Sequence, residues 1–364
     1  MPRKQLDIIM DLFIAQRDDN DKAFIAFGEE YVRYLIWKKY QFKAHEFEII
    51  VDQIKQNHIA KEVQDSSMGP IIDRTLFGDE ITNKDYPTKE KSPYVWQISR
   101  GAQVDFMQAS VLLEYCIESK RKRFSSYEFP AVIGYSHEKS EGFSRILYFL
   151  GLLDDKSKAP SKLAAIIIQN DKYFEDIGTL WILHYFIASD SKLIIWNRIA
   201  NNLIPKPSFN YEDAIQLLDN QRQNYSLKSF TTHLRKEFTT CIKAYTESNF
   251  SKLNLLTFDL ASSFYRRTQP YLVPDEILLA AIWLFKKRYH PNEVALEIKL
   301  LATAENSPGR LFYLTDRYLR DSLDRLRVKG YITIESFADL DQIKFTEFKD
   351  WLEVVSSYYK QKLT

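Results

Sequence analysis

Apolar residues recur at helical spacing along most of this chain. Near the N-terminus the apolar row consists of Ile8, Ile9, Leu12 and Phe13. Charged and polar residues interrupt this row, so it predicts an amphipathic helix and not a signal peptide. The spacing returns at Phe47 and continues to about residue 62, which predicts a helical N-terminal region.

Residues 64–100 break the helical pattern. They are polar and contain three prolines. Clusters of proline and polar residues between periodic segments mark loops. We therefore expect residues 1–100 to form a helical N-terminal region that ends in a linker-like loop.

Helical spacing resumes after residue 103, where Phe106 and Leu113 fall on one apolar face. A short second helix follows, with Gly134 as its natural stop, and Ser136 is placed to cap a third helix that reaches residue 150. Residues 154–168 then turn and return like a wing. Three helices followed by a hairpin are the order of a winged helix, so residues 101–170 are predicted as a winged-helix-like unit.

Residues 171–204 are apolar on several faces, which predicts a buried pair of helices packed by Trp181, Tyr185 and Trp196. Prolines end this pair, and Asn210 is placed to cap the next helix. Two helices then follow, so residues 171–268 are predicted as a helical middle with a helix-turn-helix-like pair.

Residues 269–364 give the clearest pattern. Helices are predicted from Pro274 to residue 289 and over residues 292–305, followed by a turn at 307–310. A third helix ends at Gly330, and residues 331–345 alternate like two short strands. This order predicts a C-terminal winged-helix unit with a closing helix.

The fold class predicted is mainly α, with two winged-helix (helix-turn-helix) units that carry short β-hairpin wings. The composition agrees with this prediction. Hydrophobic residues make up 45% of the chain, which is enough for a buried core, and only 10 residues are glycine. Folds rich in strands or phosphate-binding loops use more glycine in their turns.

The charge balance changes the functional picture. The chain contains 50 Lys and Arg residues and 49 Asp and Glu residues, which gives a formal net charge of +1. Proteins that hold DNA mainly through phosphate contacts usually carry a basic excess or a basic face. A role in DNA binding would therefore depend on a local patch.

Cysteine and histidine usage argues against bound metals. Cys116 and Cys241 lie far apart, and the six histidines form no His-x-x-x-His pair. No phosphate-binding glycine motif is present, so no cofactor is expected. No apolar run reaches the roughly 20 residues of a membrane span, and we expect a soluble, cytoplasmic protein.

Three stretches are similar to a known family. They are VIGYSHEKSEGFSRILYFLGLLDD (residues 132–155), YFEDIGTLWILHYFIASD (residues 173–190) and SPGRLFYLTDRYLRDSLDRL (residues 307–326). In this order they resemble a bacterial family known as domain of unknown function 4007, over roughly residues 125–345. The run Glu-Asp-x-Gly-Thr-Leu-Trp is the most specific part of the resemblance.

The resemblance implies a biological setting. Members of the family occur in bacterial anti-phage gene clusters, notably those of DNA phosphorothioation. They are regarded as accessory proteins with winged-helix-like parts, and no established catalytic site comes with the family. The resemblance therefore implies a non-enzymatic protein whose partners are other proteins of a defence gene cluster.

One pattern suggests a metal-dependent nuclease. Pro274-Asp275 and Glu297-x-Lys299 have the letters of a restriction-type site. Such sites need carboxylates on strands to hold Mg²⁺. Here the spacing is helical, and Asp275 is expected in the first turn of a helix, where its charge favours the helix dipole. A nuclease component of the same kind of system stays the alternative.

The first candidate DNA-binding surface combines a basic run with the polar side of the helix after Ser136. Its residues are Lys120, Arg121, Lys122, Arg123, His137, Lys139, Ser140 and Arg145. Basic side chains beside a helix-turn-helix can contact phosphates. The alternative is an ordinary solvated face, in which Glu141 and Arg145 pair on the helix.

Two other helices carry candidate DNA-binding residues. Residues 226–245 present Lys228, His233, Arg235 and Lys236, and they contain only one acidic residue, Glu237. The alternative is a basic surface helix that covers the core.

The last candidate helix contains Arg317 and Arg320 together with Arg325 and Arg327. Aspartates stand three or four residues from most of these arginines, so the helix can neutralise itself. An arginine paired on its own helix is less free to bind a guanine. We therefore expect this helix to pack within the protein or to contact a partner protein, rather than to read DNA bases.

These observations leave two functional hypotheses. The first is an accessory protein that binds double-stranded DNA with modest affinity. The second is a scaffold whose winged helices bind protein partners. The sequence leaves the identity of the partner and the oligomeric state open.

Overall fold

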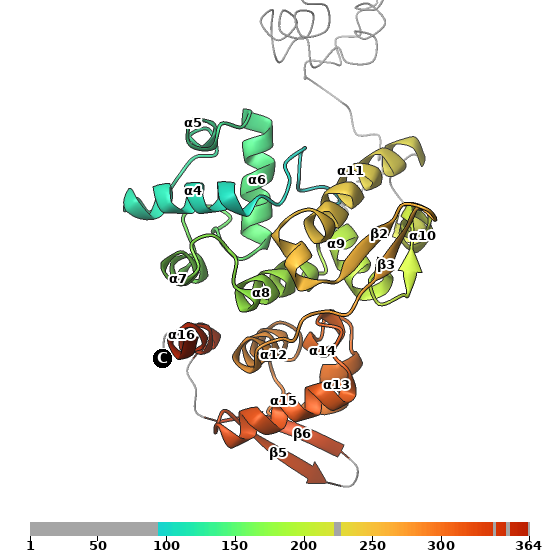
Figure 1. The fold of residues 1–364 in the computed structure, drawn as a ribbon. Coiled ribbons are helices and arrows are strands. Elements are labelled where there is room, and N and C mark those ends of the chain that lie inside the picture. The colour runs from blue at the N-terminus through green and yellow to red at the C-terminus, as the bar shows by residue number, and fades with distance from the viewer. Residues whose placement is uncertain (1–93, 222–226, 338–339, 347–349, 363–364) are drawn as a thin grey trace, which may run out of the picture. The chain divides into compact units, whose positions relative to one another are not determined.

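The computed structural model describes residues 94–221, 227–337, 340–346 and 350–362. These residues are mainly helical and include two three-stranded antiparallel sheets (Figure 1). The prediction of a mainly α fold is therefore confirmed for this part of the chain. The helices predicted for residues 1–62, and the loop up to residue 93, lie outside the described residues.

Four helices form the first part of the described chain. They are α4 (Phe106–Glu118), α5 (Phe129–Ile133), α6 (His137–Phe149) and α7 (Lys162–Asn170). Asp105 caps α4 by accepting a hydrogen bond from the amide of Gln108. Ser136 caps α6 in the same way, as predicted, with the amide of Lys139 as donor. Gly134 ends α5 with φ +68°, a left-handed conformation that favours glycine.

The wing predicted for residues 154–168 is not present as a hairpin. The backbone forms a single bridge between Leu153 and Pro160, and α7 begins directly afterwards with Ser161 as its cap. Leu163, Ala164 and Ile167 of α7 repeat at helical spacing and are buried. Burial of one such face favours a helix over a returning strand.

Helix α6 packs closely on the segment that precedes α4. A Cβ atom on Gly142 would lie 2.0 Å from the carbonyl oxygen of Ser99. Real Cβ atoms do not approach an oxygen so closely, so glycine is what lets the segment lie against the helix.

The middle of the described chain begins with a helix buried on all sides. Helix α8 (Ile177–Ala188) is followed by α9 (Ile194–Arg198), which continues directly into the π-helix η2 (Ile199–Leu203). Trp181, Tyr185 and Trp196 are buried, as predicted. The absence of a polar stripe on α8 explains its central position.

The rest of the middle region carries the first sheet. Its elements are β1 (Ser208–Phe209), α10 (Tyr211–Leu218), the 3-10 helix η3 (Asp219–Gln221), α11 (Leu227–Thr246), the 3-10 helix η4 (Asn249–Leu253), β2 (Leu256–Asp259) and β3 (Phe264–Arg267). Asn210 caps α10, as predicted, and exchanges hydrogen bonds with Asp213. Strand β3 lies between β1 and β2 and pairs antiparallel with both. This sheet is absent from the sequence-based prediction.

The C-terminal elements follow the predicted order closely. They are α12 (Asp275–Tyr289), β4 (Leu296–Glu297), α13 (Ile298–Thr303), α14 (Pro308–Leu311), α15 (Asp316–Val328), β5 (Ile332–Phe337), β6 (Leu340–Phe345) and α16 (Trp351–Lys362). The two strands predicted for residues 331–345 are present, and β6 pairs with both β4 and β5. The helix predicted over residues 292–305 is shorter, because Leu296 and Glu297 pair with β6 and the helix begins at Ile298.

Helix α16 closes the described chain onto the N-terminus of α8. The hydroxyl of Tyr359 lies 2.5 Å from that of Thr179, and Tyr358 donates a hydrogen bond of 2.8 Å to Asp176. The ring of Tyr358 covers Gly178, where a Cβ atom would approach within 2.6 Å. Segments about 180 residues apart in the sequence thus share one core.

Candidate functional site

The basic run at the end of α4 lies on the surface. Lys120, Lys122 and Arg123 are exposed and form no ion pair with another described residue. Arg121 differs, because its Nη2 atom lies 2.5 Å from a carboxylate oxygen of Glu128. Three cations of the run are therefore exposed and unpaired within the part of the chain that the structure describes.

The start of α6 adjoins this run through the turn at residues 125–128. The ring of His137 stacks on that of Tyr127 at a centroid distance of 4.1 Å. The ammonium group of Lys139 lies 3.6 Å from the ring centroid of Tyr135, a cation–π contact. The structure thus links His137 to the basic run through residues 127 and 128, whereas Lys139 contacts the residue before its own helix cap and Arg145 is half-buried.

Two predictions on α6 need correction. Ser140, predicted on the polar side, is completely buried, so its hydroxyl does not reach a ligand on the surface. Glu141 does not pair with Arg145 but with Arg100. The reason is tertiary, since the segment before α4 packs against α6 and supplies a cation that the helical spacing does not reveal.

Helix α11 presents fewer free cations than the sequence indicated. The guanidinium of Arg235 lies over the ring of Tyr211 at 4.7 Å. His233 lies with its Nδ1 atom 3.1 Å from Gln97 Oε1. Lys236 is exposed, whereas Lys228 belongs to α11 but its side chain lies outside the described ones. This face is partly used for contacts within the protein.

Glu237, the one acidic residue expected to face these cations, points into the core instead. Its Oε2 atom accepts hydrogen bonds from the amides of Ile98 and Ser99 and from the hydroxyl of Ser99, at 3.3, 3.2 and 2.8 Å. Its Oε1 atom accepts one from the indole of Trp196 at 2.8 Å. Burial raises the pKa of this carboxyl, and the donated hydrogen bonds oppose the rise.

The arginines of α15 all lie close to carboxylates. Arg317 and Asp321 form the predicted pair on the helix at 3.9 Å, and Arg327 lies 3.2 Å from Asp324. The other two do not pair on the helix as predicted. Their partners lie on other elements, namely Asp341 of β6 at 2.6 Å for Arg320 and Asp275 of α12 at 2.8 Å for Arg325.

The carboxylate of Asp275 bears directly on the nuclease alternative. Both of its oxygens accept hydrogen bonds from Arg325, each at 2.8 Å, which leaves the group engaged by a cation. Glu297 lies on a strand, contrary to the helix expected there. No group of three or more His, Cys, Asp or Glu side chains within the described ranges is arranged to hold a metal ion.

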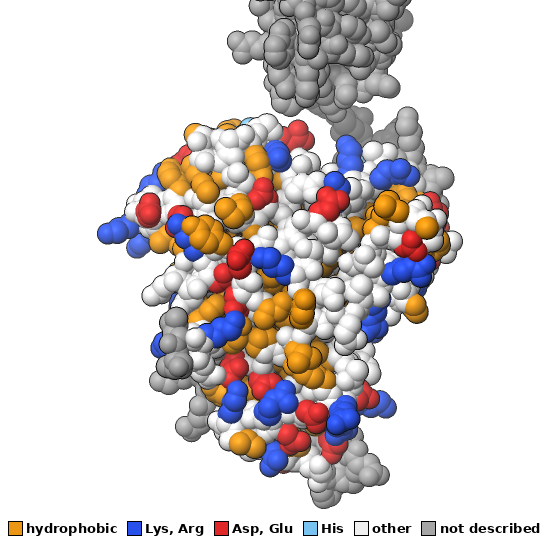
Figure 2. All heavy atoms as spheres, viewed as in Figure 1, with side chains coloured by type: hydrophobic (Ala, Val, Ile, Leu, Met, Phe, Trp, Pro, Cys, Tyr) orange, Lys and Arg blue, Asp and Glu red, His pale blue; other side chains and the backbone are white. Residues whose placement is uncertain are grey.

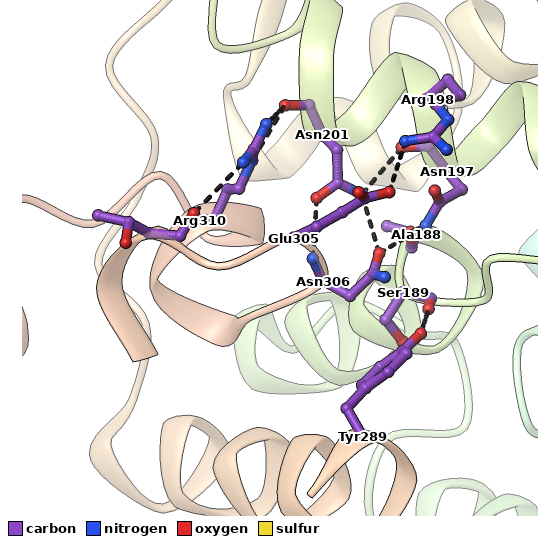
Figure 3. Close-up of polar contacts among 10 residues, drawn as sticks. Ala188, Ser189, Asn197, Arg198, Asn201, Tyr289, Glu305, Asn306 and Arg310 are labelled. Carbon is purple, nitrogen blue, oxygen red and sulfur yellow. Dashed lines mark hydrogen bonds and ion pairs between the residues drawn. The ribbon is translucent and has the colours of Figure 1, made fainter. Parts of the chain in front are cut away.

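A buried polar cluster, which the sequence did not suggest, joins η2 to the turn before α14 (Figure 3). The side-chain oxygen of Asn306 accepts hydrogen bonds from the amide groups of Asn197 and Asn201, at 2.6 and 3.0 Å. The backbone amide of Asn306 returns a hydrogen bond of 3.0 Å to Asn201. The three asparagines are buried.

The π-helix explains why this cluster is needed. Two of its carbonyl groups receive donors from outside the helix: Arg310 donates to the carbonyl of Asn201 at 2.9 Å, and Tyr313 donates to that of Ala200 at 3.0 Å. Buried carbonyl groups need such partners. The cluster contains amides, a guanidinium and a phenol but no activated nucleophile, so it acts as a structural joint.

The described fold is thus a mainly helical unit with two small sheets, and its surface cations lie mostly beside carboxylates or aromatic rings. A family model described as protein of unknown function (DUF4007) matches residues 149–359. This chain belongs to that family. The matched range contains the asparagine cluster and α15, whereas the basic run after α4 precedes it.

Two solved structures resemble the fold. A structure titled magnesium ion-bound SspB has a TM-score of 0.57 and 17% identity, and the match covers 71% of this chain and 88% of that one. A second SspB crystal structure gives 0.54 and 16%, with 72% and 90% covered. At this identity the likeness concerns the fold. No curated protein matches the chain, and none of the described helices is long and apolar enough to cross a membrane.

Proposed function

We propose that this chain is a non-enzymatic accessory protein of a bacterial anti-phage system linked to DNA modification, and that it acts there as a scaffold for partner proteins. The setting is the one implied by the family resemblance, and family membership supports it. The likeness in fold to the SspB structures is consistent with it.

The ion pairs of α15 are the observation that favours a scaffold over DNA binding. The order α12, β4, α13, the short α14, α15, β5 and β6, with a three-stranded sheet, is compatible with a winged helix in which α15 takes the place of the recognition helix. Each arginine of α15 lies within 4.0 Å of a carboxylate. Arginines that lie beside carboxylates are less free to bind phosphates or guanines, most of all Arg320 and Arg325, whose partners are on other elements. Such a helix can still pack against a protein.

DNA binding is the second candidate, and one observation favours it. Lys120, Lys122 and Arg123 are exposed and lack a carboxylate partner among the described residues. Three such contacts give weak and salt-sensitive binding to duplex DNA. We therefore expect modest affinity that is lost near physiological salt.

Co-expression with the neighbouring genes tests the scaffold. The full chain carries a tag, and each protein encoded beside it is examined for co-purification. In parallel, mobility-shift assays at low and high salt measure binding to a 30-base-pair duplex. We expect at least one neighbour protein to co-purify in stoichiometric amount. If the chain binds the duplex tightly at high salt and no protein co-purifies, DNA binding would replace the scaffold as the proposed function.

The nuclease alternative has its own measurement. One SspB structure is titled as bound to a magnesium ion, but Asp275 of this chain is held by Arg325. Incubation of the purified chain with DNA and Mg²⁺ should leave the DNA intact. Cleavage that is lost in Glu297→Ala would replace the scaffold proposal.

A further inference from the structure

Helix α4 exposes a row of apolar side chains. Met107 and Val111 are 56% and 44% exposed, and Tyr115 is also exposed. These residues stand four apart, so they follow one another along one face over about 12 Å at roughly 1.5 Å per residue. The opposite face of α4 is buried in the core. Single exposed apolar residues are common, but a continuous row is typical of an interaction site.

Neighbouring segments extend the row. Lys172 pairs with Glu114 of α4 at 2.6 Å, which places the exposed ring of Tyr173 beside the helix. Tyr127 is also exposed. It lies in the turn after α4, next to Glu128, whose carboxylate accepts a hydrogen bond from Arg121. Figure 2 shows hydrophobic side chains gathered over α4, with lysine or arginine side chains at the left edge.

We define the α4 surface by its apolar row and its basic end. The residues are Met107, Val111, Tyr115 and Tyr173 in the row, and Lys120, Lys122 and Arg123 at the end. The cations at this end are free of carboxylate partners among the described residues, unlike those of α15. The surface is therefore apolar along its length, and where α4 stops the basic residues outnumber the one exposed carboxylate there, Glu118.

We infer that the α4 surface docks one amphipathic helix of a partner protein, with apolar residues spaced three and four apart and an acidic stretch at one end. The inference deepens the proposed scaffold function and rests on it. Apolar anchors in such a helix fit the row, and carboxylates complement the three free cations. Duplex DNA would satisfy the cations but leave Met107 and Val111 exposed to water.

The test uses the full chain and the neighbour protein that co-purifies with it. Val111→Asp places a charge in the middle of the row, and Val294→Asp is the matched control because Val294 is 79% exposed elsewhere on the chain. Calorimetric titration should give a Kd at least about 10-fold higher for Val111→Asp. The control should stay within about 2-fold. Circular dichroism checks that both variants are folded.

Charge reversal tests the basic end. The triple variant Lys120→Glu, Lys122→Glu and Arg123→Glu should weaken the same complex and remove most of its dependence on salt. If the neighbour protein binds both valine variants equally, the α4 surface is not its docking site although the scaffold function stands. If no neighbour protein binds the wild-type chain, the scaffold function itself fails. Loss of a duplex shift in both the Val111→Asp and triple variants, without any protein partner, would assign the surface to DNA.

Discussion

Glu237 shows how one side chain can organise a segment far away in the sequence. Its carboxylate is buried, and its four hydrogen-bond donors come from residues 98, 99 and 196. All four donors are neutral dipoles. The side chain fastens the segment before α4 to α9 and α11.

Removing this carboxylate should be costly. Glu237→Ala leaves four buried donors without an acceptor, and we expect a loss of about 3 kcal/mol or more in the free energy of unfolding. Glu237→Gln retains one acceptor oxygen and should lose less. Glu247→Ala is the control directly after the same helix, since Glu247 forms a surface pair with Lys243 at 3.3 Å. Urea unfolding measures all three, and equal midpoints for Glu237→Ala and the control would contradict the assigned role.

His184 is a second buried residue with a defined state. Its Nε2 atom lies 2.9 Å from the carbonyl oxygen of Leu311, so Nε2 carries the proton and donates. Its Nδ1 atom, 2.8 Å from the hydroxyl of Tyr245, then accepts. Burial lowers the pKa of His184 to about 4, and the hydrogen bond to Leu311 opposes this shift.

The lowered pKa of His184 makes stability depend on pH. Its usual value is 6.5, so the unfolded chain binds a proton at a higher pH than the folded protein does. The stabilisation is complete above pH 6.5 and is lost as the pH falls towards 4, by about 3 kcal/mol in total. Unfolding of the wild type and of His184→Gln at several pH values measures it. The difference between the two should shrink on acidification, and a constant difference would refute the assignment.

At the scale of elements, the joint between η2 and α14 depends on the backbone of Asn306. This residue has φ +67°, a conformation that asparagine tolerates better than most residues. Its side chain also accepts hydrogen bonds from two other asparagines. One residue thus supplies both the turn and the centre of the polar cluster.

Two substitutions separate these contributions. Asn306→Gly removes the side-chain hydrogen bonds but suits the positive φ, whereas Asn306→Ala removes the bonds and strains the backbone. We expect a loss of about 2 kcal/mol for the glycine variant. The alanine variant should lose about 1 kcal/mol more. Thermal unfolding provides the comparison, and an alanine variant as stable as the glycine variant would show that the conformation contributes nothing.

The elements themselves were largely predictable where one face is buried. The leucines of α15, Leu319, Leu323 and Leu326, fall on one face in the sequence and are buried in the structure. Gly330 ends the helix with φ +79°, as its position indicated. The first sheet was missed because β1 has two residues and β2 and β3 have four each, too few for alternation to stand out.

At the scale of the whole molecule, the near-neutral charge of the sequence has a structural counterpart. The arginines of α15 find carboxylates on α12 and β6 as well as on their own helix. Lys120, Lys122 and Arg123 at the end of α4 have no carboxylate partner among the described residues. A balanced total charge of +1 therefore conceals one local basic end beside an apolar row.

The structure changes the environment expected for some candidate residues. The sequence named the basic run and His137 as candidates, and His137 stacks on Tyr127, next to the Glu128 that pairs with Arg121. It placed Ser140 on the surface, where the structure buries it. Helical spacing separates faces only coarsely, and which polar residue lies inside depends on the segments that pack against the helix.

The sequence by itself determined the helical character, most caps and stops, the two C-terminal strands and the resemblance to the family, because these depend on local spacing, turn chemistry and short motifs. Only the tertiary structure decided the environment of Glu237, the partners of Arg320 and Arg325, and the asparagine cluster. Glu237 and Ser99 are 138 positions apart, and Asn306 and Asn197 are 109 apart. Contacts over such separations arise from packing, and a local pattern does not encode them.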